Sequence, residues 1–234
     1  MAKQKLLLVD GSSLAFRAFF SILDLNRFKN ANGLHTNALY SFHRMFKSIL
    51  DSEKPTHVLV AWDAGKTTFR TEMYADYKGG RSKTPGEFIE QMPYFNVLLD
   101  AWGIPHYRLN QYEADDIIGT LARKGEEAGY EVVVLSGDKD LIQLADNNIT
   151  VKITTKGVTE LVEYTPEVIF EKYGLKPEQI IDMKGLMGDS SDNYPGVTKV
   201  GEKTAVKLLQ EFGSVEGIYE HVDEMKKSKL KENL

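Results

Sequence analysis

The sequence predicts an α/β protein with a mostly parallel central sheet and helices on both faces of that sheet. Short apolar runs rich in β-branched residues alternate with longer segments whose apolar residues recur at helical spacing. Strands joined by helical crossovers run parallel and are buried on both faces. From Pro166 onward only helical spacing is found, so we expect a core domain over residues 1–165 and a helical subdomain over residues 166–234.

The individual elements follow from the apolar runs and from the residues that end them. The expected strands are 5–10, 57–62, 104–109, 131–135 and 149–153, with an edge strand at 160–162. The expected helices of the core are 11–20, 36–50, 93–101, 113–128 and 141–145. Ser12 and Ser13 are suited to cap the first helix, because hydroxyl oxygens accept from the free N–H groups of a first turn. Gly129 ends the fourth helix, since glycine reaches the left-handed conformation that closes a helix.

The composition excludes several classes of protein. There is no cysteine, which rules out disulfides, thiol catalysis and zinc–thiolate sites. No apolar run approaches the roughly 18 residues of a membrane span, and the first run is too short for a signal peptide, so we expect a cytoplasmic protein without membrane contact. The net charge of −5 argues against a nucleic-acid partner, but lysine and arginine gather in residues 66–83 and 199–207 while acids gather at strand ends.

Acidic residues follow three of the expected strands and begin one expected helix. They are Asp10, Asp63, Glu113, Asp115, Asp116, Asp138 and Asp140. The carboxyl ends of parallel strands lie at one edge of a sheet, where ligands bind. A single acid in such a place is usually a turn or capping residue. Turns and caps do not explain why acids recur after three strands and at the start of a helix. Clustered carboxylates repel one another unless cations neutralise them, and hard divalent cations prefer oxygen ligands.

A further acidic pair, Asp189 and Asp192, lies in a stretch rich in Gly, Ser, Asn and Pro. Alone it predicts only a turn. The run Gly196–Gly201 follows, with the pattern Gly-Val-x-x-Val-Gly, and opens a helix. Lys199 lies within this run and Lys203 directly after it. Backbone N–H groups at a helix start attract phosphate, so this turn is suited to a nucleic-acid backbone; the alternative is an ordinary helix–turn–helix.

Residues 66–90 combine basic and aromatic side chains. On a helix, Arg70, Tyr74 and Lys78 would form one stripe, with Tyr77 on the neighbouring apolar stripe. Basic and aromatic side chains interleaved in this way suit single-stranded nucleic acid, through charge on the backbone and stacking on the bases. An amphipathic surface helix is an equally good interpretation of the pattern.

These motifs together resemble the 5′-nuclease (flap endonuclease) domain found at the N-terminus of bacterial DNA polymerase I. The likeness runs from about residue 5 to 222, and members of that family usually continue past residue 234. The matching motifs are Leu8-Val9-Asp10-Gly-Ser-Ser, Asp63 with Lys-Thr-Thr-Phe-Arg70, Tyr77-Lys78-x-x-Arg81, Glu113-Ala-Asp115-Asp116, Gly137-Asp138-Lys-Asp140, Gly188-Asp189-Ser-Ser-Asp192 and Gly196-Val-x-x-Val-Gly201-Glu-Lys-Thr204-Ala.

The resemblance implies a role for each of these groups. It implies a helical arch over residues 66–90, a helix–hairpin–helix over 184–211 that holds K⁺ beside duplex DNA, and two Mg²⁺ (or Mn²⁺) ions at the acids. The implied metal ligands are Asp10, Asp63, Glu113, Asp115, Asp116, Asp138, Asp140, Asp189 and Asp192. Lys78 and Arg81 would be catalytic together with Asp63 and Asp116. The implied DNA contacts are Arg70, Tyr74, Tyr77, Lys78, Arg81, Gly196, Val197, Lys199, Gly201, Lys203 and Thr204.

We therefore expect a structure-specific 5′-nuclease, a 5′-3′ exonuclease or flap endonuclease, that hydrolyses DNA phosphodiesters by a two-metal-ion mechanism in primer removal and repair. The expected substrates are DNA with a 5′ single-stranded flap, nicked duplex and RNA–DNA primer junctions, cut by a monomer at the bacterial nucleoid. A haloacid dehalogenase-type phosphatase needs a second acid where Ser12 stands. A non-catalytic DNA-binding module leaves the acids unexplained, and an acidic α/β ribonuclease stays open as an alternative.

Overall fold

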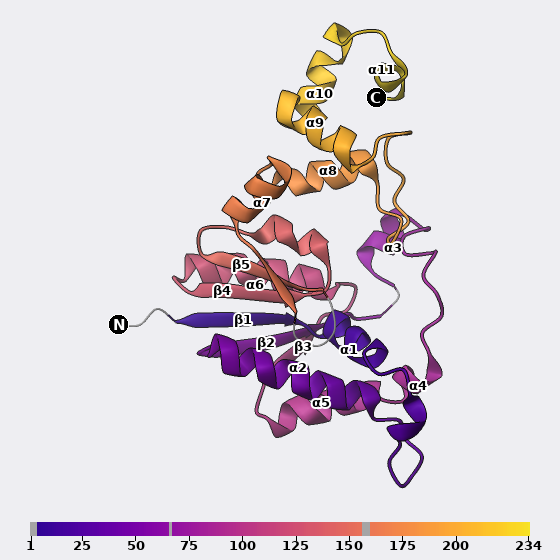
Figure 1. The fold of residues 1–234 in the computed structure, drawn as a ribbon, viewed down its shortest axis with the longest axis vertical. Coiled ribbons are helices and arrows are strands. Elements are labelled where there is room, and N and C mark those ends of the chain that lie inside the picture. Colours follow the sequence, from indigo (N-terminus) through magenta and orange to yellow (C-terminus); the bar gives the residue numbers. More distant parts are fainter. Residues whose placement is uncertain (1–3, 66, 156–159) are drawn as a thin grey trace.

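The computed structural model describes residues 4–65, 67–155 and 160–234. The described strands form one six-stranded sheet in the order β3-β2-β1-β4-β5-β6 (Figure 1). Neighbouring strands are parallel except β6, which pairs antiparallel with β5 at one edge. The strands are β1 (Lys5–Asp10), β2 (His57–Trp62), β3 (His106–Arg108), β4 (Glu131–Ser136), β5 (Ile149–Thr154) and β6 (Leu161–Tyr164). The prediction of a mostly parallel sheet is confirmed.

Helices pack on both faces of this sheet, as expected. The helices of this part are α1 (Gly11–Phe20), α2 (Asn37–Glu53), α3 (Phe69–Met73), α4 (Gly86–Ile89), α5 (Met92–Ala101) and α6 (Ala114–Glu127), with 3-10 turns η1 (Leu25–Arg27) and η2 (Lys139–Leu144). Successive side chains of a strand point to opposite faces. Leu7 and Val9 of β1 therefore join the apolar core beneath α1, α2 and α5, whereas Leu8 joins the core beneath α6.

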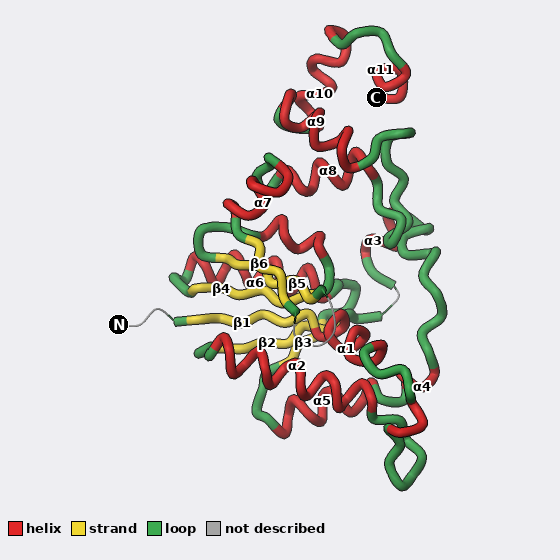
Figure 2. Tube along the Cα trace, viewed as in Figure 1, coloured by secondary structure: helices red, strands yellow, loops and turns green. Residues whose placement is uncertain are grey.

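The C-terminal part is entirely helical and extends beyond the β6 edge of the sheet (Figures 1 and 2). Its elements are α7 (Pro166–Tyr173), α8 (Gln179–Met187), α9 (Glu202–Phe212), α10 (Val215–His221), η3 (Val222–Glu224) and α11 (Lys229–Asn233). Ile180 and Met183 of α8 share one apolar cluster with Leu141 and Ile142 of η2. This continuous packing keeps α8 beside the turn that follows β4. Within the described residues, no helix is both long and apolar enough to cross a membrane.

The strand order reverses direction between β1 and β4. Residues after β1 lead to β2 and β3 on one side, whereas residues after β4 lead to β5 and β6 on the other. Where two crossovers diverge in this way, a crevice opens outside the carboxyl ends of the strands, and ligands bind there. Asp10 ends β1 and Ser136 ends β4 at this point, because Val9 is in register with Leu135.

The expected helical stripe over residues 70–78 is wrong. Among the described residues of the segment 66–90, only α3 and α4 are helical, and the residues between them form turns and extended chain along one side of the molecule (Figure 2). Tyr74 is already extended (φ −140°), and the N–H of Lys78 donates to the carbonyl of Asp192 at 2.9 Å. These long-range contacts replace helical ones, so an arch-like segment is present without a continuous helix. Lys66, where the arch was expected to begin, lies outside the described residues.

Candidate functional site

Four of the expected metal ligands, Asp10, Asp63, Asp115 and Asp138, lie where the strand order reverses. Asp10 is buried; its carboxylate accepts the N–H of Ser13 at 2.9 Å and the hydroxyl of Ser136 at 2.7 Å. Asp10, rather than Ser12 or Ser13, is therefore the N-cap of α1. Asp63 accepts the N–H of Ala114 at 2.8 Å, at the start of α6. Hydrogen bonds to Asp10 and Asp63 thus hold both carboxylates in place and connect β1, β2, β4 and α6.

Repulsion and burial act on this group of acids. The pKa of Asp10 is raised to about 6, chiefly by burial and to a smaller extent by the negative charges of Asp63 and Asp138, against hydrogen bonds from Ser13 and Ser136 that lower it. Burial also raises the pKa of Asp115 well above its usual value, together with the charges of Asp10, Asp138 and Asp63. Among the described residues, no lysine or arginine forms an ion pair with Asp10, Asp63, Asp115 or Asp138. We call these four side chains the unpaired acids.

Three cations from residues 69–81 neutralise the next group of acids. Arg70 makes a bidentate ion pair with Asp116, with both N–O distances 2.8 Å. Burial opposes ionisation of Asp116, but the Arg70 pair and the backbone N–H of Glu113 lower the pKa of that carboxyl. The ammonium of Lys78 lies 2.9 Å from the carboxylate of Glu113, a side chain that is 8% exposed. These residues are brought together as the sequence predicted, but in this structure they neutralise one another.

Arg81 and Tyr77 connect the arch-like segment to the helical subdomain. Arg81 lies 2.7 Å from Asp192. The hydroxyl of Tyr77 donates to Glu113 at 2.9 Å and also lies 3.2 Å from Asp192. Burial, followed by the hydrogen bond to Glu113, raises the pKa of Tyr77. Tyr77 was expected with Tyr74 as a contact for single-stranded DNA; its side chain is buried in this structure, so the contact stays a prediction.

The sequence interpretation missed three residues that position these groups. Lys184 of α8 lies 2.7 Å from both Asp140 and Asp189. The ring of Tyr194 stacks on that of Tyr74 with centroids 5.6 Å apart, and the side chain of Asn193 donates to the carbonyl of Asp76 at 2.9 Å. The motif around Asp189 includes Asn193 and Tyr194, but nothing in a local pattern pairs them with residues more than 100 positions away.

The acids suit a hard divalent cation in their chemistry. All are oxygen donors, they come from strand ends and a helix start, and the unpaired acids repel one another when ionised. Within the described residues, however, no three His, Asp or Glu side chains are arranged around one point that would hold an ion. The acids that carry ion pairs would have to exchange their cations before all of them coordinated metal.

The hairpin between α8 and α9 takes the expected place. Gly188 and Gly196 approach so closely that a Cβ on Gly196 would lie 2.3 Å from the nitrogen of Gly188. Gly201 is the N-cap of α9, and Lys199 and Lys203 are exposed. Glycine is therefore needed where the two segments of the hairpin cross. The turn presents backbone N–H groups and two lysines to solvent.

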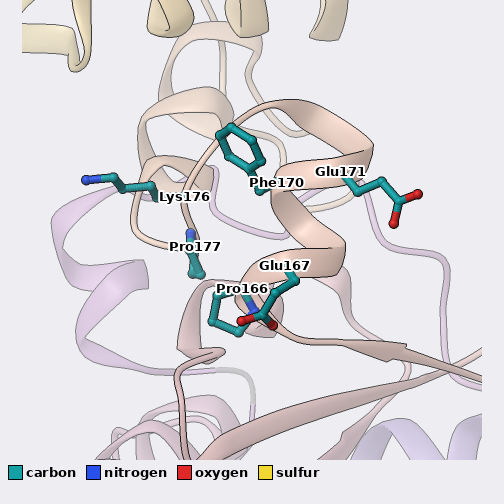
Figure 3. A pocket seen from close by; sticks show the side chains of 6 residues that line it. All are labelled: Pro166, Glu167, Phe170, Glu171, Lys176 and Pro177. Carbon is teal, nitrogen blue, oxygen red and sulfur yellow. The ribbon is translucent and has the colours of Figure 1, made fainter.

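A separate hollow lies on the helical subdomain. It is a mainly apolar depression lined by Pro166, Glu167, Phe170, Glu171, Lys176 and Pro177, between α7 and the turn that leads to α8 (Figure 3). None of the acids described above lines it. Phe170 is 63% exposed there, and the charged side chains point away from one another (Figure 3). This hollow therefore contributes nothing to the acidic site.

We predict that the metal-free protein becomes more stable as the pH falls from 7 to 5. Asp10 takes up a proton near pH 6 when folded and near pH 4 when unfolded, so the folded chain binds more protons between those values. The free energy of unfolding should rise by on the order of 1–3 kcal/mol. The acids with lowered pKa, such as Asp189 with a pKa of about 2, act in the opposite direction only at lower pH.

Melting temperatures in EDTA at pH 7, 6 and 5 measure this effect. Asp10→Asn is the control, because it removes the titrating group and should flatten the profile. If the acids bind Mg²⁺, a saturating concentration should flatten the profile as well, because the bound cation would offset their charge. A melting temperature that falls steadily from pH 7 to pH 5 in EDTA would contradict the prediction.

Comparison with known proteins places these features in a family. The family model for "5′-3′ exonuclease, N-terminal resolvase-like domain" matches residues 5–174, and the model for "5′-3′ exonuclease, C-terminal SAM fold" matches residues 175–234. DNA polymerase I of Streptococcus pneumoniae is 63% identical over 235 residues, which cover 100% of this chain. DNA polymerase I of Bacillus subtilis is 61% identical over 232 residues, which cover 99% of it. The chain spans 27% and 26% of the lengths of these two relatives.

Solved structures of nucleases have a similar fold. A phage T5 5′-exonuclease with bound divalent metal ions (zinc) has a TM-score of 0.76 and 26% identity, covering 98% of this chain and 83% of that one. A phage T5 flap endonuclease in a pseudo-enzyme-product complex with DNA and metal ions has a TM-score of 0.74, 26% identity and the same coverage. The catalytic core of Rad2 with DNA substrate has a TM-score of 0.59 at 18% identity, a likeness of fold alone; it covers 98% of this chain and 71% of that one. With both family models matched in succession and relatives this similar along its whole length, the chain belongs to the 5′-3′ exonuclease family.

Proposed function

We propose that this chain is a structure-specific 5′-nuclease that hydrolyses DNA phosphodiesters with the help of two Mg²⁺ or Mn²⁺ ions. The observation that supports it most is the group of unpaired acids where the strand order reverses, next to the cations Lys78 and Arg81. Family membership and the DNA and metal named for the phage T5 structures agree with it. A 5′-labelled flap incubated with and without Mg²⁺ tests it: release of label only with the ion is expected.

The residues proposed to hold the ions are the nine acids that the sequence motifs supply. When bound, the ions would supply positive charge that activates a water and stabilises the leaving oxygen. Lys78 and Arg81 would bind the scissile phosphate, because a cation aimed at that group offsets the charge that develops on it. Each must first leave its carboxylate, Glu113 for Lys78 and Asp192 for Arg81. DNA binding and release of these ion pairs would then occur together.

The two ends of the site would hold different parts of the substrate. We propose that the 5′ single strand passes the arch-like segment, where Arg70 and Tyr74 face it, and that the duplex lies on the hairpin of Gly196–Gly201. Val197 and Thr204 frame that turn, and the backbone carbonyls would hold K⁺ beside the duplex. Flapped and nicked DNA and RNA–DNA primer junctions all present a 5′ strand beside duplex. Such substrates would suit an enzyme that works in replication and repair at the bacterial nucleoid. We propose that it acts there as a monomer.

Replacing Lys203 with alanine should weaken binding to duplex DNA without changing the chemical step. Lys203 is exposed at the start of α9, so its removal leaves the apolar face of that helix intact. One lost phosphate contact reduces the slope of log K against log salt concentration by roughly one. Fluorescence anisotropy with labelled duplex in Ca²⁺, over several salt concentrations, measures the slope.

Lys47→Ala is the matched control. Lys47 is also an exposed helical lysine, but it lies on α2 and pairs with Asp51. An unchanged slope for Lys203→Ala, or an equal change for Lys47→Ala, would remove the hairpin from the proposed duplex-binding surface. A non-catalytic DNA-binding module would give the same binding results but no Mg²⁺-dependent product, and faster cleavage of an all-RNA substrate would favour a ribonuclease.

A further inference from the structure

Lys184 has an unusual position among the proposed metal ligands. Its ammonium lies 2.7 Å from Oδ1 of Asp140 and 2.7 Å from Oδ2 of Asp189. Asp140 belongs to η2, directly after β4, whereas Asp189 follows α8. One lysine therefore joins two acids from different parts of the fold, at the seam where α8 packs on η2.

Both carboxylate oxygens of Asp189 already have hydrogen-bond partners in this arrangement. Oδ2 accepts from Lys184 at 2.7 Å, and Oδ1 accepts both the N–H and the hydroxyl of Ser191 at 2.7 Å. Burial alone would raise the pKa of Asp189, but the hydrogen bonds from Lys184 and Ser191 lower it to about 2. An incoming ion that coordinates Oδ2 would therefore lie close to the ammonium of Lys184. A charged ammonium is the partner that a second cation repels.

The unpaired acids differ in that they lack such a cation, whereas Asp140 has Lys184 beside it even though burial raises its pKa. Burial and mutual repulsion raise the pKa values of Asp10 and Asp115, and no lysine or arginine of the described chain pairs with them. A divalent cation that binds there relieves repulsion and displaces only protons or water. The acidic site thus has one half that lacks a cation and one half that already contains one.

We propose that Lys184 is a resident counter-ion, which a divalent cation must displace from Asp140 and Asp189 before it binds to that half of the site. The proposal rests on the proposed function, since it assumes that these acids bind metal. The unpaired acids would bind an ion first and tightly, and the half that holds Lys184 would bind a second ion more weakly. Without metal, Lys184 acts as a positioning residue that keeps the two carboxylates, and with them α8 and η2, in place.

Lys184→Met tests the proposal, because methionine keeps the length of the side chain and removes its charge. Mn²⁺ is the probe, and free Mn²⁺ measured by electron paramagnetic resonance during titration of the whole chain gives both dissociation constants. In the parent protein we expect two unequal sites. In Lys184→Met the dissociation constant of the weaker site should fall by about 10- to 100-fold, a change of the size seen when a neighbour of a metal ligand is replaced. The dissociation constant of the tighter site should stay unchanged. The melting temperature in EDTA should fall and Mn²⁺ should restore it.

Two control variants separate charge from packing. Lys184→Arg keeps the charge and should keep two unequal sites. Lys172→Met removes a partly buried lysine of α7 that contacts Tyr164 rather than an acid, and it should change neither site. A weaker site that is unchanged or weakened in a folded Lys184→Met would overturn the proposal. Parent protein that binds no Mn²⁺ at all would instead refute the proposed function.

A measurement on the unmodified chain does not depend on the folding of a variant. Acylation of lysines, read by peptide mass spectrometry, reports whether an amine is held in an ion pair. Labelling of Lys184 should increase several-fold when Mg²⁺ is raised far above the tighter dissociation constant, since the ion releases the amine. Labelling of Lys172 should not change. Equal or lower labelling of Lys184 with Mg²⁺ would show that the lysine stays in place, and the proposal would fail.

Discussion

Replacing Asp115 with asparagine should abolish cleavage of a 5′ flap and at the same time make the metal-free protein more stable. Burial and the charges of Asp10, Asp138 and Asp63 oppose the ionised form of Asp115, so its pKa is raised well above the usual value. Asparagine has nearly the same shape and no charge, and it removes that repulsion. It also removes a charged oxygen ligand, which the proposed metal ions need.

The expected loss of cleavage is large. A metal ion supplies several kcal/mol of transition-state stabilisation, and about 4 kcal/mol corresponds to roughly a 10³-fold fall in rate. Single-turnover cleavage in saturating Mg²⁺ measures the rate, and thermal unfolding in EDTA measures the stability. Flap binding in Ca²⁺ should be retained, because the variant loses a negative charge and no basic residue.

Asp51→Asn is the control for a carboxylate without such neighbours. Asp51 is exposed on α2 and pairs only with Lys47, so its replacement should leave both rate and stability nearly unchanged. A structural explanation of Asp115 predicts that lost activity goes with lost stability. An Asp115→Asn variant that cleaves at near the parental rate, or that is inactive and also less stable, would contradict this role.

The sequence was sufficient for the strands and for most of the helices, because their signal is local. The run from Lys5 to Asp10 forms β1 with the predicted limits, and the segment that begins near Glu113 forms α6. Acids placed after three strands were correctly expected at one edge of the sheet. The order of the strands was not predicted, since the reversal between β1 and β4 depends on which crossover packs on which face.

Residues 70–78 show why a periodic pattern can fail. Helical spacing of Arg70, Tyr74 and Lys78 is present, but Tyr77 is buried with its hydroxyl on Glu113 instead of lying on a surface helix. The N–H of Lys78 then bonds to Asp192, across 114 residues of chain. Tertiary contacts of this kind override helix propensity, and no local window contains them.

The distribution of charge among the acids was also beyond reach of the sequence. Nine carboxylates were predicted as metal ligands, and Arg70, Lys78, Arg81 and Lys184 neutralise five of them in this structure. Each ion pair with the first three cations joins residues at least 35 positions apart, and Lys184 reaches back to Asp140 from another element. Which acids carry a cation is decided by packing of α8 and of the arch-like segment, and only coordinates show it.

Replacing Lys78 with methionine should lower the rate of the chemical step by about 10²- to 10³-fold, with little change in DNA affinity. The ammonium of Lys78 is 2.9 Å from Glu113 at the edge of the acidic site, and the proposed role requires it to move from that carboxylate to the scissile phosphate. The backbone of Lys78 has φ +57°, a left-handed conformation. Methionine meets the same backbone cost there as lysine, so the substitution changes charge without adding strain.

The comparison between rate and affinity decides the role of Lys78. Lys83 lies in the same segment and is exposed, so Lys83→Met is the matched control for the loss of one positive charge near the arch. For Lys78→Met the single-turnover rate in Mg²⁺ should fall while the dissociation constant in Ca²⁺ stays near the parental value. For Lys83→Met both quantities should agree with the parent. If affinity fell while the single-turnover rate at saturation stayed at the parental value, Lys78 would bind ground state and transition state equally, and the catalytic role would pass to Arg81 or to the metal ions alone.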